Sequence, residues 1–378
     1  MNFPVVGDAD AYAALGQSCA NFIAHAGADA SCYNGIRPIG IVIYHAIPFL
    51  LSGERVEQNY IAVLLNLLSL MVLLASLLVV FRTLCERSCG PRHWFERLAE
   101  IAIVGVVLVL CVAYIPVRLS DLQSFALFTA SLAVLTQKGN RHKVWPVIIA
   151  GLMAGIAVLL KQNYVICIFF LVIFWICFDL KEHLQSRFKY AFFYLLGVSV
   201  CLVQVAMVFY HSGNLWFYEP KMMAAYDPSN AQPYVELVAY TDPSGSAYLS
   251  RLPAELSAFQ FVAVKFYEGI AKFYFSVYLG KAPFEKTPEV LVISEAKLVY
   301  MQFVLCLTAL LTVAIAFLKN KWLSILSFMT TSSIFLTVTA LHTENRYFLM
   351  TKVYCLLILA VVLTGVVKRY TSHISKPL

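Results

Sequence analysis

The chain has 378 residues, of which 61% are hydrophobic and only 13% are charged, and its formal net charge is +7. Soluble domains carry roughly 25% charged residues, so this composition argues against a soluble protein and predicts a polytopic membrane protein. Positive charge can indicate nucleic-acid binding, but here it is concentrated in short loops between apolar runs. It therefore predicts membrane topology, and no nucleic-acid partner is expected.

Residues 1–59 are predicted to form an acidic extracytoplasmic loop followed by juxtamembrane helices. Two carboxylates, Asp8 and Asp10, stand just ahead of Tyr12. One of them could act as a general base while the other holds a metal ion or a hydroxyl group. The alternative is a solvated acidic N-terminus or a helix cap, because Asp caps helices well.

Residues 36–51 are apolar, but Pro38 and Pro48 interrupt them, which favours a re-entrant or interfacial helix pair over a single span. Arg37, at the edge of this stretch, could bind a phosphate group in a bidentate fork. The alternative is an arginine whose side chain simply extends to the membrane interface. Cys19 and Cys32 share the same extracytoplasmic segment, which permits a disulfide between them.

Further along, apolar runs of near-spanning length predict a first transmembrane bundle at 60–210 and C-terminal transmembrane helices with a cytoplasmic tail at 298–378. The intervening segment 211–297 is predicted to be an extracytoplasmic loop, with an amphipathic helix on the bilayer surface at 259–280. The fold class is thus an all-α polytopic bundle of about 9–10 transmembrane helices. The predicted spans are 60–81, 98–115, 122–136, 144–160, 163–179, 190–210, 298–318, 322–341 and 348–367.

Basic residues set the orientation of these spans. Every second connection between predicted spans is rich in basic residues. Together with the C-terminal tail these connections hold 15 of the 28 basic residues, so the positive-inside rule places them in the cytoplasm. These basic segments are 82–97, 138–143, 181–189, 319–321 and 368–378. The acidic N-terminal segment then lies outside, although no span precedes it. We favour a first membrane helix lost through a start assigned too late; the alternative is a short translocated N-tail.

Two charged residues mark the outer ends of predicted spans. Asp121 lies where two short spans meet, and a carboxylate at the membrane edge is a functional candidate. The alternatives are a salt bridge to Arg118 or an N-cap of the next helix. Lys161 lies in a connection with almost no loop, where an ammonium suits a phosphate oxygen. The alternative is an interface anchor flanked by Tyr164.

A third outer connection, 342–347, is the densest polar cluster between two spans. Arg346 could bind phosphate, with Glu344 orienting its guanidinium. The alternative is an ordinary polar turn. His342 has no partner at metal-ligand spacing and is not expected to be a ligand.

Four stretches together resemble the GT-C superfamily of polytopic glycosyltransferases, which includes protein O-mannosyltransferases and the bacterial aminoarabinose transferase that modifies lipid A. Residues 7–12 are similar to its acidic first outer loop, and 34–40 to the Arg/Pro stretch that opens its juxtamembrane helices. Residues 151–161 are similar to its small-residue helix ending in Lys, and 344–348 to its late Glu-Arg-Tyr element. The order of these stretches and the topology cover most of the chain.

The resemblance implies inverting transfer of a sugar from a polyprenyl-phosphate donor to an extracytoplasmic acceptor, which is a cell-envelope glycan, lipid or protein. It implies Asp8 as the catalytic base, Lys161 and Arg346 as donor-phosphate contacts and Asp121 as the second acidic position. Some members use a divalent cation, so Mg or Mn held by Asp8, Asp10 and Asp121 is one option for a cofactor. The implied location is the bacterial inner membrane, with the active site facing the periplasm.

Two other classes of function stay open. A transporter or flippase of a lipid-linked or anionic substrate would also need outward basic residues, and Lys352, inside the last predicted span, favours it. An inactive, glycosyltransferase-like membrane scaffold is the other alternative, which the absent first helix would support.

Overall fold

The computed structural model describes residues 7–24, 31–33, 35, 37–89, 94–116, 119–137, 139–140, 143–178, 183–215, 217, 320–340 and 349–374. Within these residues all regular secondary structure is helical, which confirms the all-α class. The predicted span at 298–318, the surface helix at 259–280 and nearly all of the 211–297 segment lie outside the described residues.

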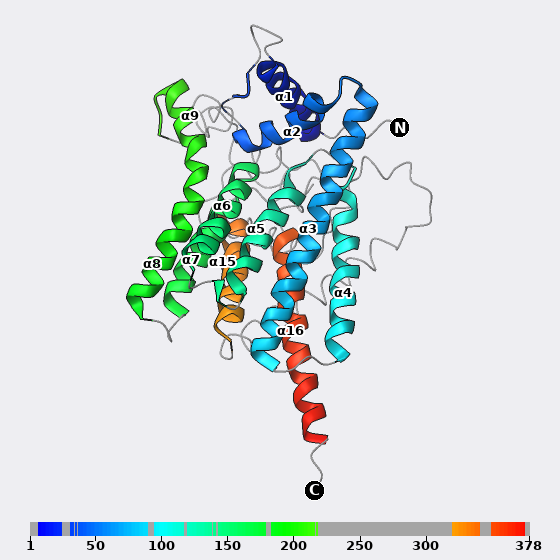
Figure 1. Ribbon diagram of the computed structural model, residues 1–378, viewed down its shortest axis with the longest axis vertical. Coiled ribbons are helices and arrows are strands. Elements are labelled where there is room, and N and C mark those ends of the chain that lie inside the picture. The colour runs from blue at the N-terminus through cyan, green and yellow to red at the C-terminus, as the bar shows by residue number, and fades with distance from the viewer. Residues whose placement is uncertain are drawn as a thin grey trace, which may run out of the picture.

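The longer helices run back and forth between two ends of the molecule (Figure 1). In chain order they are α3 (Arg55–Cys89), α4 (Trp94–Cys111), α5 (Asp121–Thr136), α6 (Val144–Leu160), α7 (Tyr164–Phe178), α8 (Leu184–Val198), α9 (Leu202–Ser212), α15 (Lys321–Ala340) and α16 (Leu349–Ile374). Two further helices, α1 (Gly7–Ile23) and α2 (Ile39–Leu51), cover one end, which we call the cap end. The opposite end, where α3 and α16 end, is the basic end.

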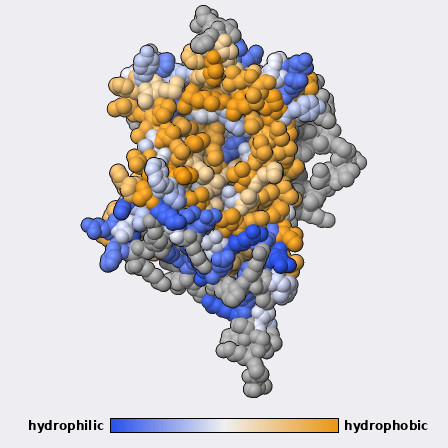
Figure 2. All heavy atoms as spheres, in the orientation of Figure 1, coloured by the Kyte–Doolittle hydropathy of each residue, from blue (hydrophilic) through white to orange (hydrophobic). Residues whose placement is uncertain are grey.

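Three helical stretches, Arg55–Arg87, Leu184–Ser212 and Leu349–Thr371, are long and apolar enough to cross a membrane, and α2, α5, α6 and α7 are shorter apolar helices. In the space-filling view, hydrophobic side chains form a broad belt between the two ends, with hydrophilic residues gathered at the basic end (Figure 2). A belt of this kind is what lipid-facing helices require. Three helical stretches of the described part thus have the length and composition that an integral membrane protein requires.

Two local predictions at the cap end were wrong. The expected acidic loop is helical, as α1, because its Ala-rich sequence favours a helix and acidic residues in the first turn complement the helix dipole. The expected helix pair at 36–51 is one helix, α2. Pro38 takes the N-cap position and Pro48 lies in the last turn, where the lost N–H costs at most one helical hydrogen bond.

Helix α5 lies at the centre of the bundle, with nearly all of its residues buried, and it contacts α3 on one side and α6 on the other. Helix α6 packs very closely on α8, because Gly151 faces the Tyr194 carbonyl and Gly197 faces the Ile148 carbonyl at distances too short for a Cβ. Small residues permit such close helix contact in membranes. Gly40 likewise lets α2 rest directly on Leu159, which brings α2 onto the cap end of α6.

Candidate functional site

Asp121 and Lys161 form an ion pair at the cap end of the bundle, between Lys161 Nζ and Asp121 Oδ1. Asp121 is the first residue of α5, and Lys161 directly follows α6. The side chains are 5% and 15% exposed, respectively, so both charges are largely removed from solvent. The neighbouring helices α5 and α6 thus bring together two of the residues that the sequence analysis assigned to one outer site.

The alternatives for these two residues can now be compared with the structure. Ser120, not Asp121, occupies the N-cap position of α5. Arg118, the other suggested partner of Asp121, lies outside the described residues. Tyr164 is buried rather than placed as an anchor at the membrane surface, so Lys161 and Tyr164 do not form the expected interface pair. Asp121 itself is the counter-ion of Lys161.

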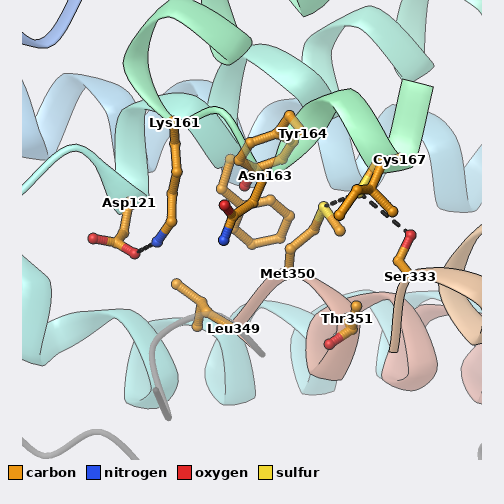
Figure 3. A pocket seen from close by; sticks show the side chains of 11 residues that line it. Asp121, Lys161, Asn163, Tyr164, Cys167, Ser333, Leu349, Met350 and Thr351 are labelled. Carbon is orange, nitrogen blue, oxygen red and sulfur yellow. Dashed lines mark hydrogen bonds and ion pairs between the residues drawn. The ribbon is translucent and has the colours of Figure 1, made fainter. Parts of the chain in front are cut away.

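The ion pair lies at one end of a pocket between α5, α7, α15 and α16 (Figure 3). Beyond the charged groups the walls are mainly apolar and aromatic, with a few small polar groups. The lining residues are Asp121, Phe125, Lys161, Asn163, Tyr164, Ile166, Cys167, Ser333, Leu349, Met350 and Thr351. The charged groups of this pocket are thus gathered at one end, and apolar side chains line most of the remainder.

Three helices meet around the sulfur atoms at the end of the pocket away from the ion pair (Figure 3). The Ser333 hydroxyl of α15 donates to Cys167 Sγ of α7 at 3.4 Å, and Cys167 Sγ lies 4.0 Å from Met350 Sδ of α16. These contacts join helices that are distant in the sequence and fix the shape of the apolar wall. Met is well suited to such a surface because its flexible, polarisable side chain adapts to irregular ligands.

Helix α16 connects the pocket to the predicted cluster at 342–347. Its first residues, Leu349, Met350 and Thr351, line the pocket. Glu344 and Arg346 lie outside the described residues, so their predicted roles stay predictions. Lys352, the next residue along α16, is only 6% exposed.

Two of the residues predicted at the N-terminal end, Arg37 and Tyr12, are in contact. The guanidinium carbon of Arg37 lies 5.3 Å from the centre of the Tyr12 ring, and Tyr12 stacks on His45 with 5.3 Å between ring centres. Arg37 is therefore held by a cation–π contact with α1. The backbones of Asp8 and Asp10 lie in the first turn of α1, but their side chains lie outside the described part of the chain.

A buried polar network, which sequence reasoning missed, lies beside Asp121. Gln123 Nε2 donates to Tyr44 Oη at 2.8 Å and also to Asn66 Oδ1, and Asn66 Nδ2 donates to the Ile115 carbonyl at 2.8 Å. Burial raises the pKa of Tyr44, so the phenol stays protonated and donates to Asn66 Oδ1 at 3.3 Å. The network joins α2, α3, the end of the α4 segment and α5. Its signal in the sequence is an Asn and a Gln within apolar spans.

The cap is cross-linked by a disulfide between Cys19 of α1 and Cys32, as the sequence permitted. Next to it, Ser18 Oγ donates to the Ser31 carbonyl at 3.1 Å and accepts from the Ser31 N–H at 3.2 Å. The chain then reaches α2, whose first N–H, on Ile39, donates to the fully buried Gln204 Oε1 at 2.8 Å. Arg37 thus belongs to a segment held on both sides.

No group of three or more His, Cys, Asp and Glu side chains suited to a metal ion occurs among the described residues. The carboxylate of Asp121 is occupied by the Lys161 ammonium, and a positive neighbour disfavours a divalent cation at the same oxygen atoms. The Lys161 ammonium thus pairs with one oxygen atom of Asp121, and a metal ion at this carboxylate stays a prediction. The predicted Mg or Mn site also involves Asp8 and Asp10, whose side chains are not described.

Comparisons of the chain with protein-family models, with curated proteins and with solved structures find no match.

Proposed function

We propose that the protein is an inverting glycosyltransferase that moves a sugar from a polyprenyl-phosphate donor to an acceptor outside the cytoplasm. The observation that carries this proposal is the Asp121–Lys161 pair at the charged end of an otherwise apolar pocket. A polyprenyl-phosphate sugar combines an anionic group with a long apolar chain, so its two parts match the two parts of the pocket. The resemblance of residues 7–12, 34–40, 151–161 and 344–348 to the GT-C superfamily supports the same reaction class.

In this proposal Lys161 is the main contact of the donor phosphate. As the bond between the anomeric carbon and the phosphate oxygen breaks, negative charge develops on the phosphate, and a fixed ammonium nearby stabilises it. The prenyl chain would lie along the apolar wall formed by Phe125, Leu349 and Met350. Arg37 and Arg346 are proposed as further cations, with Glu344 orienting Arg346.

Asp8 is proposed as the general base. It would take the proton from the acceptor hydroxyl or amine as that atom attacks the anomeric carbon from the side opposite the phosphate, which inverts the configuration. Asp10 and Tyr12 would support the position of Asp8 at the start of α1. A divalent cation held by Asp8, Asp10 and Asp121 stays a prediction, and we derive no step through it.

We further propose that the cap end faces the periplasm of a bacterial inner membrane. Disulfides persist in oxidising compartments, so the Cys19–Cys32 bridge supports an extracytoplasmic cap. The described basic residues at the ends of α3, α8 and α16 then face the cytoplasm, in agreement with the positive-inside rule.

One observation favours a transporter or flippase instead. Lys352 lies inside α16 with an exposure of only 6%, and buried charges within membrane helices often mark a transport path. A flippase would move the lipid-linked donor without breaking its sugar–phosphate bond, so the two candidates differ in their products.

The test is sugar transfer by the purified, detergent-solubilised protein given a panel of polyprenyl-phosphate sugars, with Asp8→Asn and Lys161→Gln run alongside. We expect the wild type to release polyprenyl phosphate and both variants to lose that activity. A matched control is Glu57→Gln, which removes an exposed carboxylate in the first turn of α3. Movement of intact donor across proteoliposomes, with no release of polyprenyl phosphate from any donor, would contradict the proposal and favour the flippase.

A further inference from the structure

Helix geometry fixes the carboxylate of Asp121 beside Lys161. Asp121 occupies the first position of α5, where the unpaired N–H groups and the positive end of the helix dipole favour a negative side chain. Lys161 follows α6 and reaches the same point from the neighbouring helix. The pairing therefore exists before any ligand arrives.

Both charged groups of the pair are poorly exposed, so each needs an opposite charge close by. A lysine that is 15% exposed at the end of an apolar pocket requires a counter-charge, since an unpaired ammonium in such a place is costly. Asp121, at 5% exposure, supplies this counter-charge in the absence of an anionic ligand. The positive charge of Lys161 and the negative charge of Asp121 then cancel, although the Lys161 ammonium is a cation suited to phosphate.

An incoming phosphate meets both members of the pair. It is attracted by the ammonium of Lys161 and repelled by the carboxylate of Asp121, which lines the same pocket. We propose that Asp121 is the resting counter-ion of Lys161 and that the phosphate group of the ligand displaces it. This inference rests on the proposed role of Lys161 as the phosphate contact.

The displacement has a consequence for turnover. A lysine without a competing carboxylate would hold the polyprenyl phosphate product as firmly as it holds the donor. Asp121 competes for the same ammonium, so it weakens product binding and helps the lysine to release phosphate. Removal of the carboxylate should accordingly strengthen phosphate binding, whereas loss of an ordinary ligand contact would weaken it.

The experiment measures equilibrium binding of farnesyl phosphate, a prenyl phosphate without a sugar, to the full chain in lipid nanodiscs. We expect Asp121→Asn to bind this probe on the order of tenfold more tightly than the wild type, which corresponds to one unit in the logarithm of Kd. Asp121→Ser, which also removes the carboxylate, should show the same gain, and it serves if the Asn variant does not fold. Adding Lys161→Gln to either Asp121 variant should abolish this gain in affinity. The control variant Glu57→Gln should bind the probe like the wild type.

Inorganic phosphate provides a second arm, since the carboxylate acts on the phosphate group and not on the prenyl chain. The ratio between the Asp121→Asn variant and the wild type should be similar for inorganic phosphate and farnesyl phosphate. Two results would overturn the role of Asp121 as counter-ion while leaving Lys161 as a phosphate contact. One is equal or weaker phosphate binding by both Asp121 variants, and the other is a gain in affinity confined to farnesyl phosphate. Unchanged binding by Lys161→Gln would overturn the phosphate contact itself, and with it the proposed function.

Discussion

The two ends of the helix bundle use ion pairs in different ways. At the basic end, Glu96 of α4 pairs with Lys368 of α16, and Glu100 of α4 pairs with Arg82 of α3 at 2.7 Å. These pairs join helices to one another and do not line the pocket of Figure 3. At the cap end, the Asp121–Lys161 pair also joins two helices, but it faces that pocket.

Other cations at the basic end also have structural roles. Arg87 donates to the carbonyl of Thr136, the last residue of α5, and Arg187 Nη1 donates to the Ile176 carbonyl near the end of α7 at 2.7 Å. Both guanidinium groups satisfy carbonyls in the last turn of a helix, where the dipole favours positive charge. The basic residues that indicate topology in the sequence thus also fasten the helix ends. Charge at the basic end joins helices, whereas the Asp121–Lys161 pair at the cap end also lines a pocket.

The largest expected effect is on activity at the cap end. Lys161→Gln should lower kcat/KM for sugar transfer by about 10²–10³-fold, because one preorganised contact to the developing phosphate charge is lost. Because the substitution also leaves the buried Asp121 carboxylate without this partner, the melting temperature should fall too, so kcat/KM is compared per folded molecule. The matched control is Lys143→Gln, which alters the exposed lysine at the other end of the same helix, α6. If Lys161→Gln and Lys143→Gln lowered kcat/KM equally, the cap end and the basic end would not differ in their effect on activity.

A slightly smaller effect is expected on stability at the basic end. Glu96→Gln removes the carboxylate partner of Lys368, whose side chain is only 9% exposed, and should lower the free energy of unfolding by about 3 kcal/mol. Replacing both residues, as Glu96→Leu with Lys368→Met, should be much closer to neutral, because no buried charge remains. Chemical denaturation of the detergent-solubilised protein measures both values. An activity loss per folded molecule in Glu96→Gln would conflict with a purely structural pair.

The buried network beside Asp121 should give an intermediate effect. Asn66→Leu leaves the carbonyls of Tyr114 and Ile115 without this donor, at a cost of about 1–3 kcal/mol in unfolding free energy. A suitable control is Leu68→Ala, on the exposed side of the same helix. If both variants melt at the same temperature, the network does not contribute to stability.

The smallest effect is expected at Arg82. Its side chain is 45% exposed, so Arg82→Gln should cost about 1 kcal/mol or less in unfolding free energy, despite the good geometry of its pair with Glu100. Raising the salt concentration should reduce the difference between variant and wild type. If Arg82→Gln lowered the unfolding free energy as much as Glu96→Gln does, side-chain exposure would not explain the relative strength of the Arg82–Glu100 and Glu96–Lys368 pairs.

The sequence was most informative about the central helices. The predicted spans 122–136 and 144–160 agree closely with α5 and α6, because charged or turn-forming residues flank their apolar runs. Helix α3 extends to Cys89, well beyond the predicted limit at 81, since hydropathy detects the apolar part of a helix and not the helix itself. Arg82 and Arg87 belong to its last turns, where basic residues are favourable.

Pairing between distant residues was harder to predict than the helices. Sequence reasoning assigned Asp121 and Lys161 to one outer site, with a salt bridge from Asp121 to Arg118 as an alternative, and it did not predict an ion pair between Asp121 and Lys161. The contact between α5 and α6 brings this pair together, and it depends on packing that hydropathy does not report. The Tyr44–Asn66–Gln123 network was missed for the same reason, because its members come from three helices.

The Cys19–Cys32 disulfide also bears on the order of assembly during synthesis. It closes a loop between residues only 13 positions apart, so it can form as soon as this segment reaches an oxidising compartment. The contact between Gly40 and Leu159, in contrast, must wait until α6 has been made, more than a hundred residues later. The cross-linked cap would therefore exist as a preassembled unit before the bundle is complete, and α6 would supply the surface on which it docks.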